Sequence, residues 1–143
     1  MPAIAELVQS GKLSPKASAA LADKRITYHD PCYLGRYNGV YDPPREILKR
    51  IPGVELVEPA YWTKQRGLCC GAGGAQMWKE EENGTMRVNM ARFAEAKSTG
   101  ANTVAVGCPF CLSMLSDASK AEGGEIQVKD VAEVVAERMI QPA

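Results

Sequence analysis

The stretch Thr103-Val104-Ala105-Val106-Gly107-Cys108-Pro109-Phe110-Cys111 decides how this sequence folds. Its first four residues form a near-continuous apolar run rich in β-branched side chains, which predicts a buried strand. Pro109 suits the first position of a helix, so we expect the strand to lead into a helix that begins between the two cysteines. A buried strand that leads into a helix is the repeating unit of an α/β fold.

The rest of the sequence repeats this alternation. Further strands are predicted at residues 25–29, 54–57 and 126–128, and a short helix is predicted near the N-terminus, ending at Gly11. Asp42 is predicted to cap a second helix. A third helix, which closes at Gly100, is predicted from the stripe of Met86, Met90, Phe93 and Lys97. Asp130 and Glu133 have the spacing of a capping box that begins the last helix.

Connections of this length favour parallel strands joined by right-handed crossovers. The predicted fold is therefore a single α/β domain, with a parallel sheet of about four strands flanked by helices and the cysteine-bearing loops at the C-terminal edge of the strands. Residues 1–24 are expected to form an N-terminal helix and leader, with the leader over residues 10–23, and residues 25–143 are expected to form the cysteine-rich domain.

The composition excludes several classes of function. The chain has 143 residues, 17 basic and 17 acidic, and a formal net charge of zero. It therefore lacks the excess of positive charge that drives non-specific binding to nucleic acid, and no nucleic-acid partner is expected. We find neither an export signal nor a stretch of apolar residues long enough to cross a membrane, so we expect a cytoplasmic protein without direct membrane insertion.

The five cysteines fall into three groups, each placed after a predicted strand. Cys32 follows the first strand, the adjacent Cys69 and Cys70 lie in a glycine-rich loop, and Cys108 and Cys111 flank the start of a helix. Because ligands of open α/β sheets bind at the carboxyl ends of the strands, the three groups are expected to converge on one site. The glycines of that loop, Gly71, Gly73 and Gly74, leave a backbone that can wrap closely around an inorganic core and direct N–H groups at its sulfurs.

The number of thiols limits the choice of metal. A structural zinc site takes four ligands, which leaves one of the five cysteines unused and places the adjacent Cys69 and Cys70 awkwardly at one tetrahedral centre. A cluster of several irons removes both difficulties, although the spacing of cubane ferredoxins is absent. A third possibility is a metal-free thiol–disulfide exchanger that uses Cys108 and Cys111.

The full pattern resembles the cysteine-rich CCG domain of heterodisulfide reductase B and D subunits and related iron–sulfur oxidoreductases. The resemblance rests on Cys32, Cys69-Cys70-Gly71 and the Cys108/Cys111 pair, and it extends from about Arg25 to Glu137. The phrases at residues 29–36 and 69–74 are most similar to the C-terminal CCG domain of oxidoreductases that link flavoproteins to a membrane quinone.

This resemblance implies a noncubane [4Fe-4S] cluster held by all five cysteines, which carries electrons or reduces a disulfide. It also implies partners: other oxidoreductase subunits with ferredoxin-type clusters or flavin, and a quinone-linked membrane subunit that would hold the chain peripherally at the cytoplasmic membrane. Members of this family usually carry two such domains and this chain carries one, so we expect its electron donor in another chain. The alternative is a non-redox module with structural zinc bound by four of the five cysteines.

Other residues near the cysteines are also candidates. His29, the only histidine, is the natural proton donor if a disulfide is cleaved at the site. The alternative for His29 is a hydrogen-bonded residue at a strand end. Trp62 and Trp78 flank the cysteine pair and are predicted to be packing residues, with the shielding of a cluster from water as the alternative.

Overall fold

A computed structural model describes residues 1–14, 24–80 and 83–139. Four strands form one parallel sheet in the order β2-β1-β3-β4, with β1 at Lys24–Tyr28, β2 at Val54–Leu56, β3 at Thr103–Val106 and β4 at Gln127–Asp130. The predicted α/β fold with a four-stranded parallel sheet is confirmed. The predicted leader at residues 10–23 lies largely outside the described residues.

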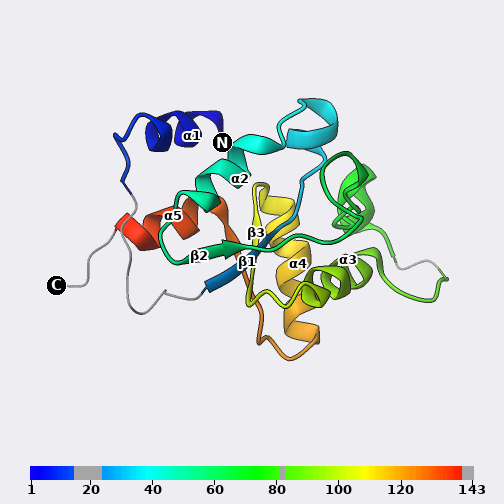
Figure 1. Ribbon diagram of the computed structural model, residues 1–143. Coiled ribbons are helices and arrows are strands. Elements are labelled where there is room, and N and C mark those ends of the chain that lie inside the picture. The colour runs from blue at the N-terminus through cyan, green and yellow to red at the C-terminus, as the bar shows by residue number, and fades with distance from the viewer. Residues whose placement is uncertain (15–23, 81–82, 140–143) are drawn as a thin grey trace.

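Helices cover both faces of the sheet (Figure 1). α1 (Pro2–Gln9), α2 (Asp42–Lys49) and α5 (Val131–Met139) pack on one face, where Ile26, Tyr28 and Ala105 point. α3 (Val88–Ser98) and α4 (Pro109–Ala121) pack on the other face against Val104 and Val106. The alternation of side chains along β3 therefore serves two separate hydrophobic cores, as expected for a sheet that is covered on both sides.

Of the two helix starts that were predicted from capping residues, one is confirmed and one is wrong. The capping box of α5 is confirmed, because the Asp130 carboxylate accepts from the N–H of Ala132 and the Glu133 carboxylate accepts from the N–H of Asp130, both at 2.8 Å. The prediction for Asp42 is wrong, since Tyr41 is the N-cap of α2 and the Asp42 side chain pairs with Lys64 instead.

The third predicted helix is also shorter than expected. α3 begins at Val88, so Met86 precedes it and is 64% exposed, and Lys97 points to solvent. Phe93 is buried as predicted, and the other buried residues of this helix are Ala96 and two polar residues, Asn89 and Arg92.

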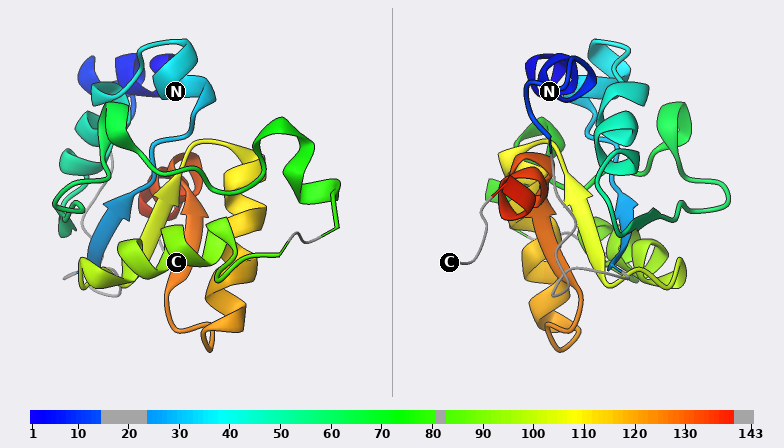
Figure 2. Two further views of the ribbon diagram at one scale, coloured as in Figure 1. Left: turned by 90° about the vertical axis from the view of Figure 1, so that its right-hand side faces the viewer. Right: turned by 60° about the vertical axis from the view of Figure 1, so that its left-hand side comes forward.

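The four strands are parallel, so their carboxyl ends lie at the same edge of the sheet. The arrows of β1, β3 and β4 point toward this edge in the left view of Figure 2. At this edge the connection from β1 leads to α2 on one face, while the connection from β3 leads to α4 on the other face. The adjacent strands β1 and β3 therefore flank a topological switch point, where the connections separate and open α/β sheets bind their ligands. Within the described residues, no helix is long and apolar enough to cross a membrane.

Candidate metal centre

The five cysteines, which we call the cysteine site, come from three segments at the carboxyl edge of the sheet. Cys32 lies four residues beyond the end of β1 and begins a helical turn at Tyr33–Tyr37. Cys69 and Cys70 lie in the connection between β2 and α3, and Cys108 follows β3 as the N-cap residue of α4, with Cys111 in the first turn.

Hydrogen bonds link the thiols of three of the cysteines. The thiol of Cys70 forms hydrogen bonds with those of Cys69 and Cys111. Cys32 joins these three residues in the lining of one cavity, so each of the three segments contributes to it. Cys108 does not appear in the described lining of this cavity, but it packs against the hydrophobic cluster that contains Cys70 and Cys111.

The surroundings of the cysteine pair favour the protonated thiols in the metal-free chain. The hydrogen bond with Cys70 and then burial raise the pKa of Cys69. The hydrogen bond with Cys111, followed by burial, raises the pKa of Cys70 to about 11. Because metals bind the thiolate, binding of a metal to these cysteines would release protons.

The glycine-rich loop directs backbone N–H groups at Cys69. The N–H of Gly71 lies 3.3 Å from the Cys69 sulfur, and the N–H of Gly73 also bonds to it. Gly71 has φ +95°, and a Cβ there would meet the Asn89 nitrogen and the Met114 methyl group at 3.2 Å. This position needs glycine both for its backbone conformation and for the close approach of α3 and α4.

The start of α4 adds a favourable electrostatic field. Pro109 occupies the first turn of α4, as predicted, and the unpaired N–H groups of that turn face the region of Cys108 and Cys111. The positive end of the helix dipole stabilises negative charge, and thiolates carry such charge when they bind metal.

His29 lies beside the sulfurs, at the end of β1. A ring nitrogen of His29 and the Sγ atoms of Cys70 and Cys111 all lie within 4.8 Å of one another, and all three residues are buried. The Nε of Arg92, on α3, donates a hydrogen bond of 2.9 Å to Nδ1 of His29. Burial, followed by the charge of Arg92, lowers the pKa of His29 to about 3, so the imidazole is neutral. The expected hydrogen bond at the strand end is present, while the role of proton donor stays a prediction.

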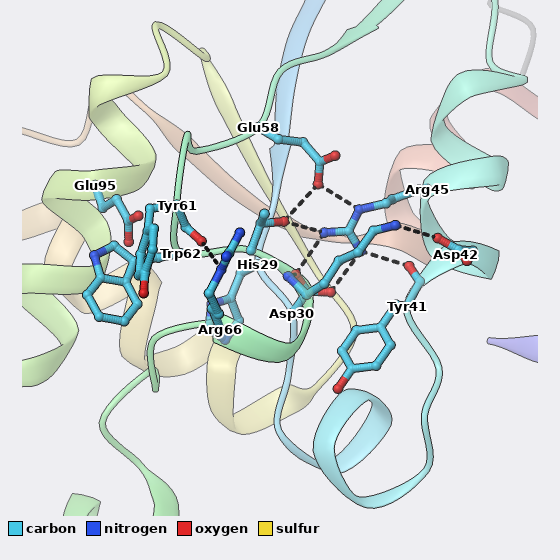
Figure 3. A network of polar contacts seen from close by, with 12 residues as sticks. His29, Asp30, Tyr41, Asp42, Arg45, Glu58, Tyr61, Trp62, Arg66 and Glu95 are labelled. Carbon is cyan, nitrogen blue, oxygen red and sulfur yellow. Dashed lines mark hydrogen bonds and ion pairs between the residues drawn. The ribbon is translucent and has the colours of Figure 1, made fainter.

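Asp30, the next residue in the chain, is held by a second buried arginine (Figure 3). Arg45 of α2 donates two hydrogen bonds, of 2.8 and 2.7 Å, to the carboxylate of Asp30. The side chain of Arg45 is only 4% exposed and that of Asp30 only 3%. Arg45 also donates to Glu58 and Thr63 in the connection that leads from β2 toward Cys69.

The two arginines hold the same connection from opposite faces of the sheet. Arg92 donates to the carbonyl oxygen of Trp62 at 2.9 Å, and the N–H of Lys64 donates to Asp30 at 2.7 Å. The segment that follows Cys32 is tied to it as well, because Arg36 donates to the carbonyl oxygen of Gly67 at 2.6 Å. The geometry of the cysteine site therefore depends on two buried arginines that the sequence analysis did not identify.

The aromatic residues around the site are more exposed than predicted. Trp62 is 43% exposed and Trp78 is 71% exposed, so the prediction that both are packing residues is wrong. Trp78 contacts Phe110, which lies between the two cysteines of α4.

Comparison with known proteins agrees with this site. A family model for the cysteine-rich domain CCG matches residues 26–116, which include all five cysteines. The chain is 52% identical over 96% of its length to a probable iron-sulfur-binding oxidoreductase, FadF, of Bacillus subtilis. It is 43% identical over 92% of its length to an EtfAB:quinone oxidoreductase of Syntrophomonas wolfei. It is 38% identical over 95% of its length to the D subunit of a dihydromethanophenazine:CoB–CoM heterodisulfide reductase of Methanosarcina barkeri.

The chain corresponds to only part of each of these relatives. It covers 19% of the length of the Bacillus and Syntrophomonas proteins and 32% of the Methanosarcina protein. No solved structure matches it.

Proposed function

The chain belongs to the CCG cysteine-rich domain family, and from that premise we propose that it is an iron–sulfur redox component whose five cysteines bind a noncubane [4Fe-4S] cluster. The observation that carries this proposal is the convergence of Cys32, Cys69, Cys70 and Cys111 on one cavity, from segments far apart in the sequence. Cys108, at the start of the helix that carries Cys111, completes the proposed ligand set.

The donor set fits an iron–sulfur cluster. Thiolates are the usual ligands of such clusters, and adjacent thiolates such as those of Cys69 and Cys70 can bind different irons. The N–H groups of Gly71 and Gly73 already point at a sulfur, and the helix dipole of α4 offsets negative charge. We further propose that Gly74 belongs to the wall of the cluster site.

A bound cluster of this kind would supply one-electron transfer, either along a chain of carriers or to a disulfide. The protein residues hold the cluster, shield it with the core of α3 and α4, and donate hydrogen bonds to its sulfurs. For the case that a disulfide is the substrate, His29 is proposed as the proton donor, because it is the only histidine and its ring lies beside two of the sulfurs. In that role the neutral ring would first have to take up a proton, against the effect of burial and of the Arg92 charge.

The partners and the organisation of the chain are part of the same proposal. We propose that residues 25–143 are the cluster-binding domain and that residues 1–24 are an N-terminal extension whose helix α1 packs on α2. The partners would be oxidoreductase subunits with flavin or ferredoxin-type clusters, as in heterodisulfide reductases and flavoprotein:quinone oxidoreductases. Such a partner would hold the chain peripherally at the cytoplasmic membrane.

Anaerobic reconstitution tests this function. The chain should take up about four irons and four sulfides, become brown and give an electron paramagnetic resonance spectrum distinct from that of a cubane cluster. Serine variants of the five cysteines should each lose or alter the bound iron, with Cys70→Ser and Cys108→Ser the most severe. Lys120→Ser, at an exposed position of α4, is the matched control and should bind iron normally.

The same experiment separates the alternatives. A colourless protein that binds one zinc, with one of the five cysteine variants fully tolerated, would replace the cluster by a structural zinc site. A chain that takes up no metal but cycles between a dithiol and a Cys108–Cys111 disulfide would instead be a thiol–disulfide exchanger.

A further inference from the structure

The contacts of His29 decide which of its ring nitrogens carries a proton. The Nδ1 atom accepts a hydrogen bond from Nε of Arg92, and arginine does not give up its protons in proteins. Nδ1 must therefore be the unprotonated nitrogen of the neutral ring, and Nε2 must carry the hydrogen. The side chain of Arg92 is 1% exposed and is also bound to Trp62 and Glu95, so it is not free to turn away.

This arrangement is the reverse of the one that makes a histidine a metal ligand. A ligating histidine binds metal through one unprotonated nitrogen and donates the N–H of the other to a carboxylate or a carbonyl group. In His29 the nitrogen that faces Arg92, Nδ1, already accepts a hydrogen bond, so the other nitrogen, Nε2, is the donor. Although its ring lies within 4.8 Å of the Cys70 and Cys111 sulfurs, His29 is therefore suited to donate to sulfur rather than to bind iron.

We propose that His29 donates its Nε2–H to a sulfur of the cysteine site, that this bond raises the reduction potential of the bound cluster, and that Arg92 is the positioning residue that fixes the donor nitrogen. The inference rests on the proposed function, because it requires a cluster. Reduction adds one electron to the cluster and its ligands, and a hydrogen-bond donor at a ligand sulfur stabilises the added charge. No proton leaves His29 in this step, so the electron alone is transferred.

The position of the proton can be measured without a cluster. His29 is the only histidine, so its two ring nitrogens give the only imidazole signals in a nitrogen-15 spectrum. The metal-free chain should show the Nε2–H form alone, whereas Arg92→Met should show a mixture of both neutral forms. A wild-type spectrum dominated by the Nδ1–H form would overturn the role of Arg92, whether or not the chain binds iron.

The effect on the potential is tested with reconstituted protein. His29→Leu removes the donor and should lower the equilibrium constant for reduction about tenfold, which is 59 mV for a one-electron couple. His29→Gln retains both an acceptor for Arg92 and an N–H donor, so its potential should stay near that of the wild type. Arg92→Met should lower the potential by a smaller amount, and Lys97→Met, at an exposed position of the same helix, should not change it.

The dependence of the potential on pH distinguishes a fixed donor from a proton donor. A fixed Nε2–H predicts a potential that does not change between pH 6 and 8, whereas uptake of one proton with the electron would change the equilibrium constant tenfold per pH unit.

An unchanged potential in fully loaded His29→Leu would overturn the proposal. Should His29→Leu fail to fold, an unchanged potential in Arg92→Met would overturn the role of the fixed donor. Loss of the cluster from both His29 variants, with Arg92→Met fully loaded, would identify His29 as a ligand instead. If the wild type itself binds no iron, the proposed function fails, and the spectrum of the metal-free chain still decides the form of His29.

Discussion

The two loops that flank Cys69 and Cys70 differ in how they are held. The loop before the pair, residues 57–67, is bound by side chains from both helical layers: Arg45 holds Glu58 and Thr63, and Arg92 holds the carbonyl oxygen of Trp62. The loop after the pair, described at residues 71–80 and 83–87, is mostly exposed. It borders a cleft of about 690 Å³ that also reaches Cys69.

The two loops therefore have different tasks at the cysteine site. The loop of residues 57–67 fixes where the pair lies, because two buried arginine side chains, one from each helical layer, hold it through hydrogen bonds. The described part of the loop after the pair, residues 71–80 and 83–87, leaves one side of Cys69 open, and its glycines donate backbone N–H groups to the Cys69 sulfur. Changes in the first loop should therefore affect the stability of the whole fold, and changes in the second should act mainly near the pair.

The largest effect is expected when Arg45 is removed. Arg45→Met leaves the carboxylate of Asp30 buried without its partner, which should lower the free energy of unfolding by about 3–5 kcal/mol. Urea denaturation of the metal-free chain measures this loss. Lys49→Met, at an exposed position of the same helix, is the matched control, and an equal loss in both variants would contradict the role given to the buried pair.

Removal of the second arginine should cost less. Arg92→Met leaves the neutral Nδ1 of His29 and the Trp62 carbonyl oxygen without a donor, and it removes the partner of the Glu95 carboxylate. The two neutral groups are cheaper to leave unpaired than a charge, and the Glu95 side chain is 17% exposed, so water can solvate it better than the buried Asp30. We expect a loss of about 2–3 kcal/mol in the same denaturation experiment. A loss larger than that of Arg45→Met would show that Arg92 contributes more to the free energy of unfolding than Arg45 does.

A smaller and more local effect is expected in the exposed loop. Gly71→Ala introduces a side chain at φ +95° against α3 and α4, and should cost about 1–2 kcal/mol. Gly123→Ala is the matched control, since its φ of +102° carries backbone strain while nothing lies within 4 Å of the added carbon. Gly71→Ala should reduce iron uptake during reconstitution more than Gly123→Ala does, and equal uptake in the two variants would show that the close approach of α3 and α4 to Gly71 is not the cause.

Much of this site could be predicted from the sequence because parallel strands impose it. Once residues 25–29 and 103–106 were recognised as parallel strands, Cys32 and Cys108 had to emerge at the same edge of the sheet. The capping box at Asp130 was equally accessible, because its two hydrogen bonds join residues that are three or fewer apart in the sequence.

The arginines could not be paired with their partners in this way. Arg92 contacts a residue 63 positions away, and arginine is usually exposed, so neither its burial nor its partner follows from local pattern. A signal was present, since Arg92 lies on the same stripe of α3 as the buried Asn89 and Ala96. A charged residue on a buried stripe indicates a partner elsewhere in the fold, and His29 is that partner.

The smallest effect is expected where the loop before the pair is held at the surface. Lys64 pairs with Asp42 at 3.0 Å, and the hydrogen bond from Lys64, followed by its charge, lowers the pKa of Asp42. A carboxyl group whose pKa is lower in the folded chain stabilises the fold above its unfolded pKa, and this contribution is lost as the pH falls through the folded pKa. Asp42→Asn should therefore shift the urea midpoint slightly at pH 7 and not at all at a pH below the folded pKa, and 1 M salt should abolish the shift at pH 7. A shift as large as that of Arg45→Met would mean that exposed and buried contacts hold this loop equally, and the distinction between the two loops would then rest on the glycines alone.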